Sequence, residues 1–172
     1  MKIKLTQATA KHFVSKDVFR PSMQGIYIDV KNQKAVMTNG TVMLIVNIEV
    51  DETIENSFIM PISSLPKKKE AEVTFDGTTI TTIELGQPTI ISAPIAEYYP
   101  DYMAVKPKFD DERVYTPMIS LNPSFFAGFA CAAKNFDGND ITLEIFGAEK
   151  AIKITPIEND SWEGLLMPRR KN

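Results

Sequence analysis

The sequence of 172 residues predicts an α+β fold that is rich in β-structure and built from repeated βαβββ units. Three observations lead to this prediction. Most of the chain consists of short runs in which apolar residues alternate with polar ones, as in strands. Two longer segments carry apolar residues at helical spacing. The order of one strand, one helical segment and three strands recurs about 55 to 60 residues apart, a period typical of structural repeats.

The predicted strands are short and are separated by turn residues. Asn39-Gly40 separates two of them, and Asp76-Gly77 is a strong hairpin signal. The strands span Lys2–Gln7, Gly25–Val30, Lys34–Met37, Val42–Val50, Phe58–Met60, Glu72–Phe75, Thr78–Leu85, Thr89–Ile95, Met118–Leu121, Ile141–Phe146, Ala151–Thr155 and Leu165–Met167.

Two segments are predicted to be helical and to lie on one side of the sheets. Thr9–Arg20 begins at a capping threonine and ends before Pro21. Its apolar stripe consists of Ala10, Phe13, Val14 and Val18. Pro123–Asn135 follows Asn122, a good N-cap residue, and has proline at its first position.

The repeat divides the chain into three units. We expect residues 1–105 to form one domain from units 1–57 and 58–105, with 106–117 as an extended connector. Residues 118–172 then form a third unit, half of a second domain. The second unit is the weakest copy, because Pro66 interrupts the segment where its helix should lie.

Composition narrows the classes of protein. The chain contains 19 basic and 22 acidic residues, and this net charge of −3 argues against a simple basic nucleic-acid binder. It does not exclude a protein whose positive charges gather on one surface. The sequence has neither a long apolar span nor a signal-peptide pattern. Cys131 is the only cysteine, which excludes an intrachain disulfide, and we expect a cytoplasmic location.

No pattern indicates catalysis, so we expect no enzyme, cofactor or metal site. His12 is the only histidine, and no cysteine, aspartate or serine stands at a spacing from it that would indicate a catalytic site. Cys131 lies among alanines, as a small filler of the core would. The segment Asn135–Asp140 is rich in side chains of the kind that bind calcium, but it has only half the length of a calcium loop, which favours a turn.

Five strings, taken in order, resemble those of the bacterial DNA sliding clamp, the β subunit of DNA polymerase III. Met37–Met43 resembles the A-T-D-G-H-R-L segment, and Phe58–Pro61 resembles the strand ending in proline that opens the second unit. The other three are Glu72–Gly77, which resembles the following hairpin; Tyr99–Tyr102 with Pro107, which resembles F-P-D-Y…P; and Leu165–Arg169, which resembles the V-M-P-M-R-L terminus. The resemblance covers nearly the whole chain, but three units are half the number in a clamp subunit.

The resemblance implies a non-catalytic protein of DNA replication or repair. It further implies a groove in which partners such as a DNA polymerase dock a short peptide. The matching positions are Thr38, Gly40, Thr41, Val42, Met43, Pro61, Met167, Pro168 and Arg169. Thr41 and Val42 replace the family's His-Arg, so the preferred peptide should differ. On residues alone, Met43 and Met167 are equally well explained as ordinary core.

The resemblance also implies that duplex DNA is bound without sequence preference. In the predicted first helix His12, Lys16 and Arg20 are spaced to form one stripe, and Lys67-Lys68-Lys69 stands where the second helix should be. Lys134 lies on the predicted helix of the third unit, Pro123–Asn135. We predict that these seven residues face DNA, although solvated helix faces are often basic without any such role.

Two further expectations remain open at this stage. Three units for each chain, against twelve in a clamp ring, predict a homo-oligomer: four chains match the arithmetic, and a dimer is nearly as well supported. The alternative function is a clamp-fold interaction decoy or a phage structural or assembly protein that does not encircle DNA.

Overall fold

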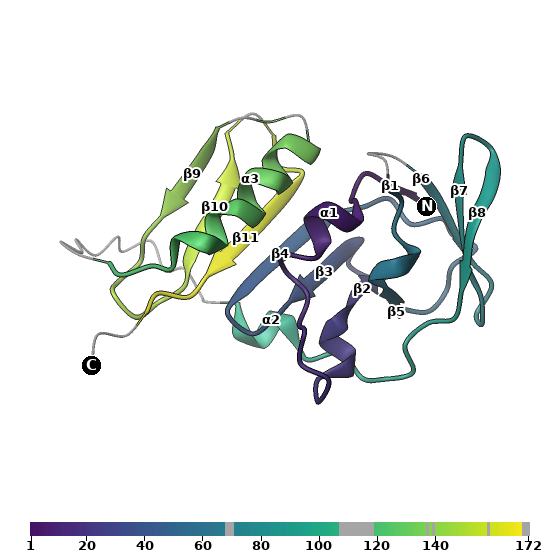
Figure 1. The fold of residues 1–172 in the computed structure, drawn as a ribbon, viewed down its shortest axis with the longest axis horizontal. Coiled ribbons are helices and arrows are strands. Elements are labelled where there is room, and N and C mark those ends of the chain that lie inside the picture. The colour runs from purple at the N-terminus through teal and green to yellow at the C-terminus, as the bar shows by residue number, and fades with distance from the viewer. Residues whose placement is uncertain (68–70, 107–118, 137, 139, 158, 170–172) are drawn as a thin grey trace.

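The computed structural model describes residues 1–67, 71–106, 119–136, 138, 140–157 and 159–169. These residues form two antiparallel sheets, with the helices lying against them (Figure 1). The strands are β1 (Lys2–Ile3), β2 (Gly25–Asp29), β3 (Lys34–Thr38), β4 (Val42–Asn47), β5 (Phe58–Pro61), β6 (Ala71–Phe75), β7 (Ile80–Glu84), β8 (Gln87–Ser92), β9 (Ile141–Glu144), β10 (Ile152–Pro156) and β11 (Trp162–Leu166).

The helices are few and short. They are α1 (Gln7–Ala10), α2 (Tyr102–Val105) and α3 (Phe126–Asn135), with the 3-10 turns η1 (Pro21–Gln24), η2 (Ile62–Ser64) and η3 (Pro123–Phe125). The predicted helix Pro123–Asn135 is confirmed, because η3 runs directly into α3. Asn122 caps η3 as expected, since its side chain accepts a hydrogen bond from the backbone N–H of Ser124.

The order of the strands joins distant parts of the chain. The smaller sheet has the order β1-β6-β7-β8, and the larger has the order β5-β2-β3-β4-β11-β10-β9. The pairing of β4 with β11 places Val42 opposite Leu166 and Met43 opposite Leu165. The first and third units therefore share one continuous sheet.

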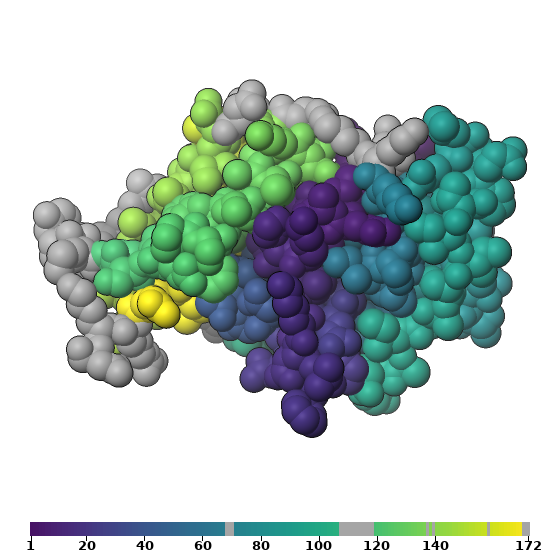
Figure 2. Space-filling model, in the orientation of Figure 1, coloured from purple at the N-terminus to yellow at the C-terminus, as the bar shows by residue number. Residues whose placement is uncertain are grey.

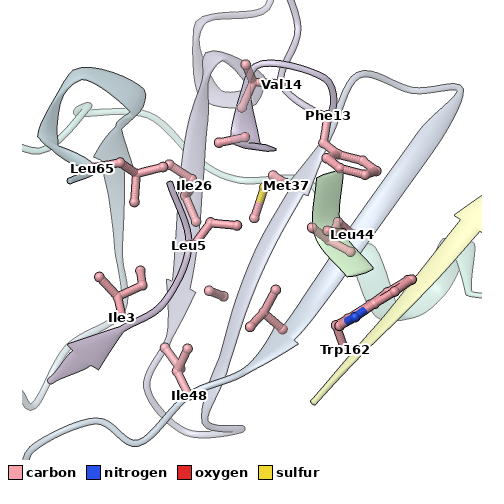
Figure 3. Close-up of a cluster of buried hydrophobic side chains, with 14 of the residues drawn as sticks. Ile3, Leu5, Phe13, Val14, Ile26, Met37, Leu44, Ile48, Leu65 and Trp162 are labelled. Atoms are coloured by element: carbon pink, nitrogen blue, oxygen red, sulfur yellow. The ribbon is translucent and has the colours of Figure 1, made fainter. Parts of the chain in front are cut away.

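The main core lies between the large sheet and the helices. Phe13, Phe129 and Leu44 are fully buried there, and Figure 3 shows Phe13 and Leu44 with Trp162 at the boundary between β4 and β11. The ring of Phe129 packs edge-on against Phe13, with centroids 5.2 Å apart, and stacks near Trp162 at 6.3 Å. Helices α1 and α3 therefore cover the same face of the sheet, as predicted (Figure 1).

A buried polar group also ties the two helices together. The Oδ1 atom of Asn135 accepts hydrogen bonds from the hydroxyls of Thr6 and Thr9, at 3.2 and 3.4 Å. Its Nδ2 donates to the carbonyl of Lys4. Because buried polar groups are costly unless paired, these bonds favour one placement of α3 beside α1.

The predicted helix Thr9–Arg20 is wrong beyond its first turn, because α1 ends at Ala10. Side chains compete with the helical backbone here: Ser15 Oγ accepts from the N–H of Asp17, and Asp17 Oδ1 accepts from the N–H of Phe19. Phe13 and Val14 still reach the core, but Val18, which the helical spacing predicted to be buried, is 74% exposed.

The predicted strand Met118–Leu121 is also not observed. Met118 lies outside the described residues, and Ile119–Leu121 forms no strand. Local sequence favours a strand at this place, but a strand also needs a neighbour with which to exchange hydrogen bonds.

Candidate functional site

An apolar cavity of about 210 Å³ lies at the boundary between β4 and β11, on the sheet face opposite α1 and α3. We call it the β4–β11 groove. Its lining residues come from η1, from the end of β3 and the turn into β4, from the start of β4, from the end of β11, from the residue before β10 and from the segment that contains α2. They are Met23, Thr38, Gly40, Thr41, Val42, Met43, Tyr99, Pro100, Tyr102, Val105, Ala151, Leu165 and Met167.

The turn between β3 and β4 forms one wall of the groove and is held by its own side chains. Thr38 Oγ1 donates to the carbonyl of Val42 at 2.8 Å, and Asn39 Oδ1 accepts from the N–H groups of Thr41 and Val42. Gly40 has φ +88°, a conformation that glycine adopts without strain. The local sequence T-N-G therefore builds a rigid edge for the groove.

Tyrosines form the opposite wall. The ring of Tyr99 stacks on that of Tyr27 with centroids 5.0 Å apart, and Asp101 caps the short helix α2 through the N–H groups of Met103 and Ala104. The hydroxyl of Tyr102 donates to Asp29 Oδ2 at 2.9 Å. These contacts fix the tyrosine rings before any ligand arrives.

The ionisation of this tyrosine–aspartate pair follows from its surroundings. Burial acts to raise the pKa of Asp29, but hydrogen bonds from Asn32 and Tyr102 outweigh it and hold this pKa below its usual value. Burial, together with the bond to Asp29, raises the pKa of Tyr102. The pair therefore remains a tyrosine hydroxyl and a carboxylate at neutral pH.

The structure brings together six of the nine groove residues named from the sequence: Thr38, Gly40, Thr41, Val42, Met43 and Met167. Pro61 does not line the groove, since it lies at the end of β5 opposite Gly25. Pro168 and Arg169 follow Met167 but are not lining residues, and the N–H of Arg169 donates to the carbonyl of Ser120. The proline in the wall is Pro100, from the Tyr99–Tyr102 string.

The basic residues named from the sequence do not form the predicted stripe, because α1 ends before them. Arg20 lies at the groove instead: a Cβ added to Gly40 would stand 3.2 Å from its Nη1 atom. Lys67 is exposed beside Glu84, whose carboxylate accepts from its backbone N–H, and Lys68 and Lys69 lie outside the described residues.

Positive charge does gather where α1 and α3 meet. His12 Nε2 lies 3.8 Å from the Sγ of Cys131 on α3, and Lys134 is exposed in the last turn of the same helix. Burial lowers the pKa of His12, and the charges of Lys11 and Lys16 lower it further. Figure 2 shows the α1 and α3 segments side by side on this face. Sequence reasoning omitted Lys11, which only the turn after α1 brings here.

Neither a metal site nor a membrane-spanning helix is found among the described residues. No group of three histidine, cysteine, aspartate or glutamate side chains there is arranged to hold a metal ion. Within the same residues, no helix has the length and apolarity needed to cross a membrane.

Comparison with solved structures identifies the fold as that of bacterial DNA sliding clamps. The chain superposes on the DNA polymerase III β subunit of Borrelia burgdorferi with a TM-score of 0.70 and 18% identity, over 100% of this chain and 65% of that one. The β subunit from Streptococcus pyogenes gives 0.72 and 16% over 99% and 65%, and the β sliding clamp of C. crescentus gives 0.73 and 12% over 99% and 65%. The predicted β-rich α+β clamp fold is thus confirmed.

The chain spans about 65% of the length of these solved clamp subunits. No protein-family model and no curated protein matches its sequence. At 12 to 18% identity these structures define the fold of the chain, and its function depends on its own residues.

Proposed function

We propose that this protein is a non-catalytic, sliding-clamp-like protein of DNA replication or repair, which docks a partner peptide in the β4–β11 groove. The groove itself carries the proposal. Its walls are apolar, it sits on rigid strand ends and a capped helix, and it contains the methionines Met23, Met43 and Met167. Flexible thioether side chains suit the capture of short apolar peptide segments.

The charge at the rim suggests the kind of peptide. Arg20 lies close to Gly40, and its side chain remains 56% exposed although its Nε is 3.5 Å from Asp17 Oδ2. A peptide with leucine and phenylalanine side chains and one acidic residue would fill the cavity and meet this charge.

The first prediction tests the groove. Met167 lines it and is 44% exposed, so Met167→Asp should fold normally while placing a charge against the apolar part of the peptide. We expect a fluorescein-labelled hexapeptide with leucine, phenylalanine and one aspartate to bind the native chain and to bind the variant at least about 10-fold more weakly, by fluorescence anisotropy. Met103→Asp is the matched control, because Met103 is 56% exposed on α2 but does not line the groove. Equal loss in both variants would contradict the site.

We further propose that the face of α1 and α3 contacts duplex DNA through phosphates. Lys11 and Lys16 lie close enough to His12 to lower its pKa, His12 contacts Cys131 of α3, and Lys134 is exposed three residues further along the same helix. Contacts with phosphates alone carry no sequence preference, which is what movement along DNA requires.

The second prediction concerns salt. One phosphate contact from each of Lys11, Lys16 and Lys134 would give a slope of roughly −3 in a plot of log K against log salt concentration. Replacing Lys16 and Lys134 by alanine should flatten this slope by about 2, measured on linear and nicked circular duplexes. The control removes the same charge from hairpin turns, as Lys31→Ala with Lys150→Ala. If peptide binding persists without any DNA binding, the interaction decoy becomes the better description.

A further inference from the structure

We infer that two copies of this chain associate through their third units, each inserting its segment Ile119–Leu121 beside β9 of the other. Such an exchange would complete two half-domains at once. The inference adds a defined interface to the proposed function and depends on neither the groove nor DNA binding.

The first two units supply the template for this exchange. The first strand of each does not pair with the sheet of its own unit but with that of the other. Strand β1 of the first unit pairs with β6 of the second, with Lys2 opposite Glu72. Strand β5 of the second unit pairs with β2 of the first, with Pro61 opposite Gly25. A unit of this kind is therefore complete only in a reciprocal pair.

The third unit has the same two apolar positions before its helix cap as the first and second units. Ile3 and Leu5 precede the cap residue Thr6 in the first unit, and Phe58 and Met60 precede the cap position Pro61 in the second. Ile119 and Leu121 stand at the same distances before the cap residue Asn122. The four residues in the completed units are at most 6% exposed, whereas Ile119 and Leu121 remain only half-buried.

One edge of this segment is already occupied in the same way in all three units. Lys2 bridges Glu49 beyond β4, the carbonyl of Ile59 accepts from the N–H of Ile95 beyond β8, and the carbonyl of Ser120 accepts from Arg169 beyond β11. The last two distances are 2.9 and 2.8 Å. In the first two units the other edge is paired with the partner unit. In the third, no described residue pairs with it.

The matching strand edge is that of β9, the last strand of the large sheet, whose outer edge pairs with no strand among the described residues (Figure 1). Leu143 of β9 is directly opposite Ile154 of β10, which is fully buried, so both side chains face the helix-covered core. Even so, Leu143 is 43% exposed and the following Ile145 is 39% exposed. At the other end of the same sheet, where β5 covers β2, Ile26 and Ile28 are 0% exposed.

The occupant that fits is a second copy of the chain. Each copy has one segment, Ile119–Leu121, that could pair with β9 of the other copy. Two copies related by a twofold axis would therefore form both pairings at once. The exchange is closed, and it covers an apolar strand edge that would otherwise invite uncontrolled pairing. It also accounts for the predicted strand Met118–Leu121, whose described part, Ile119–Leu121, forms no strand in a single chain.

The test is the mass in solution and its response to a charge on β9. Sedimentation equilibrium of the native chain should give twice the mass of the 19.3 kDa monomer at micromolar concentrations. Leu143→Lys, at a position already 43% exposed in the monomer, should raise the dissociation constant of the dimer at least about 100-fold, because a symmetric interface contains the change twice. Leu85→Lys is the matched control, since Leu85 is 91% exposed in a distant turn, and it should leave the dimer intact.

Hydrogen exchange provides a readout without substitution. Amides of residues 141–145 should be protected at concentrations above the dissociation constant and exchange faster on dilution, while those of β3 stay protected throughout. A native chain that stays monomeric up to millimolar concentration would overturn the inference. A dimer that Leu143→Lys does not weaken, with no dilution-dependent exchange at β9, would place the interface elsewhere and overturn it equally.

Discussion

Replacing Phe129 by alanine is expected to lower the free energy of unfolding by about 3 to 5 kcal/mol. Phe129 is fully buried and lies between Phe13 of the first unit and Trp162 of the third. Its removal therefore leaves a cavity where the two units meet. Urea unfolding followed by circular dichroism, at one fixed protein concentration, would measure the loss.

Phe19→Ala is the matched control, because Phe19 is 88% exposed and should change stability by less than about 0.5 kcal/mol. A loss of under 1 kcal/mol for Phe129→Ala would show that α3 is not held to the sheet by this ring. Peptide binding should weaken along with stability, because the β4–β11 pairing that Phe129 packs against also forms the groove.

Gly164→Ala is expected to destabilise the protein by about 3 kcal/mol, near the upper end for overpacking. Gly164 lies in β11 between Leu44 of β4 and Ile154 of β10. A Cβ atom there would stand 2.2 Å from Cε1 of Phe129, far inside van der Waals contact. The ring cannot easily move aside, because Phe13 and Trp162 enclose it. Urea unfolding again gives the measurement.

A double-mutant cycle isolates this contact. In the Phe129→Ala background the added methyl group meets no ring, so Gly164→Ala should cost at least about 1 kcal/mol less than in the native chain. Additive losses would mean that the strain of Gly164→Ala arises from the strand backbone and not from the ring of Phe129.

The sequence predicted the fold class from features that act over short distances. Alternating apolar residues identified most strands within a few residues of their observed ends, and Asn122-Pro123 located the start of η3 and α3. The helix Thr9–Arg20 was predicted too long, because apolar spacing does not reveal that Ser15 and Asp17 bond to the backbone in turns.

The residues of the candidate groove could be predicted only in part from the sequence. Of the residues that the resemblance named, Thr38, Gly40–Met43 and Met167 line the groove, whereas Pro61 does not and Pro100 does. Pro100, Tyr99 and Tyr102 were visible in the sequence as part of a motif, yet nothing local places that motif against β4. Their position depends on the bond between Tyr102 and Asp29 and on the stack of Tyr99 on Tyr27, which join residues more than 70 positions apart.

Most strands, the helix α3 and the recurring unit could be predicted from the sequence, because periodicity and capping are properties of neighbouring residues. The pairing of β11 with β4, which creates the groove and the shared sheet, was visible only in the folded chain. The same is true of the exposed apolar side chains of β9 and of the edge of Ile119–Leu121 that no described residue pairs with. Strand pairing is set by which apolar faces can be buried together, and that is a property of the whole chain and, as we infer, of two chains.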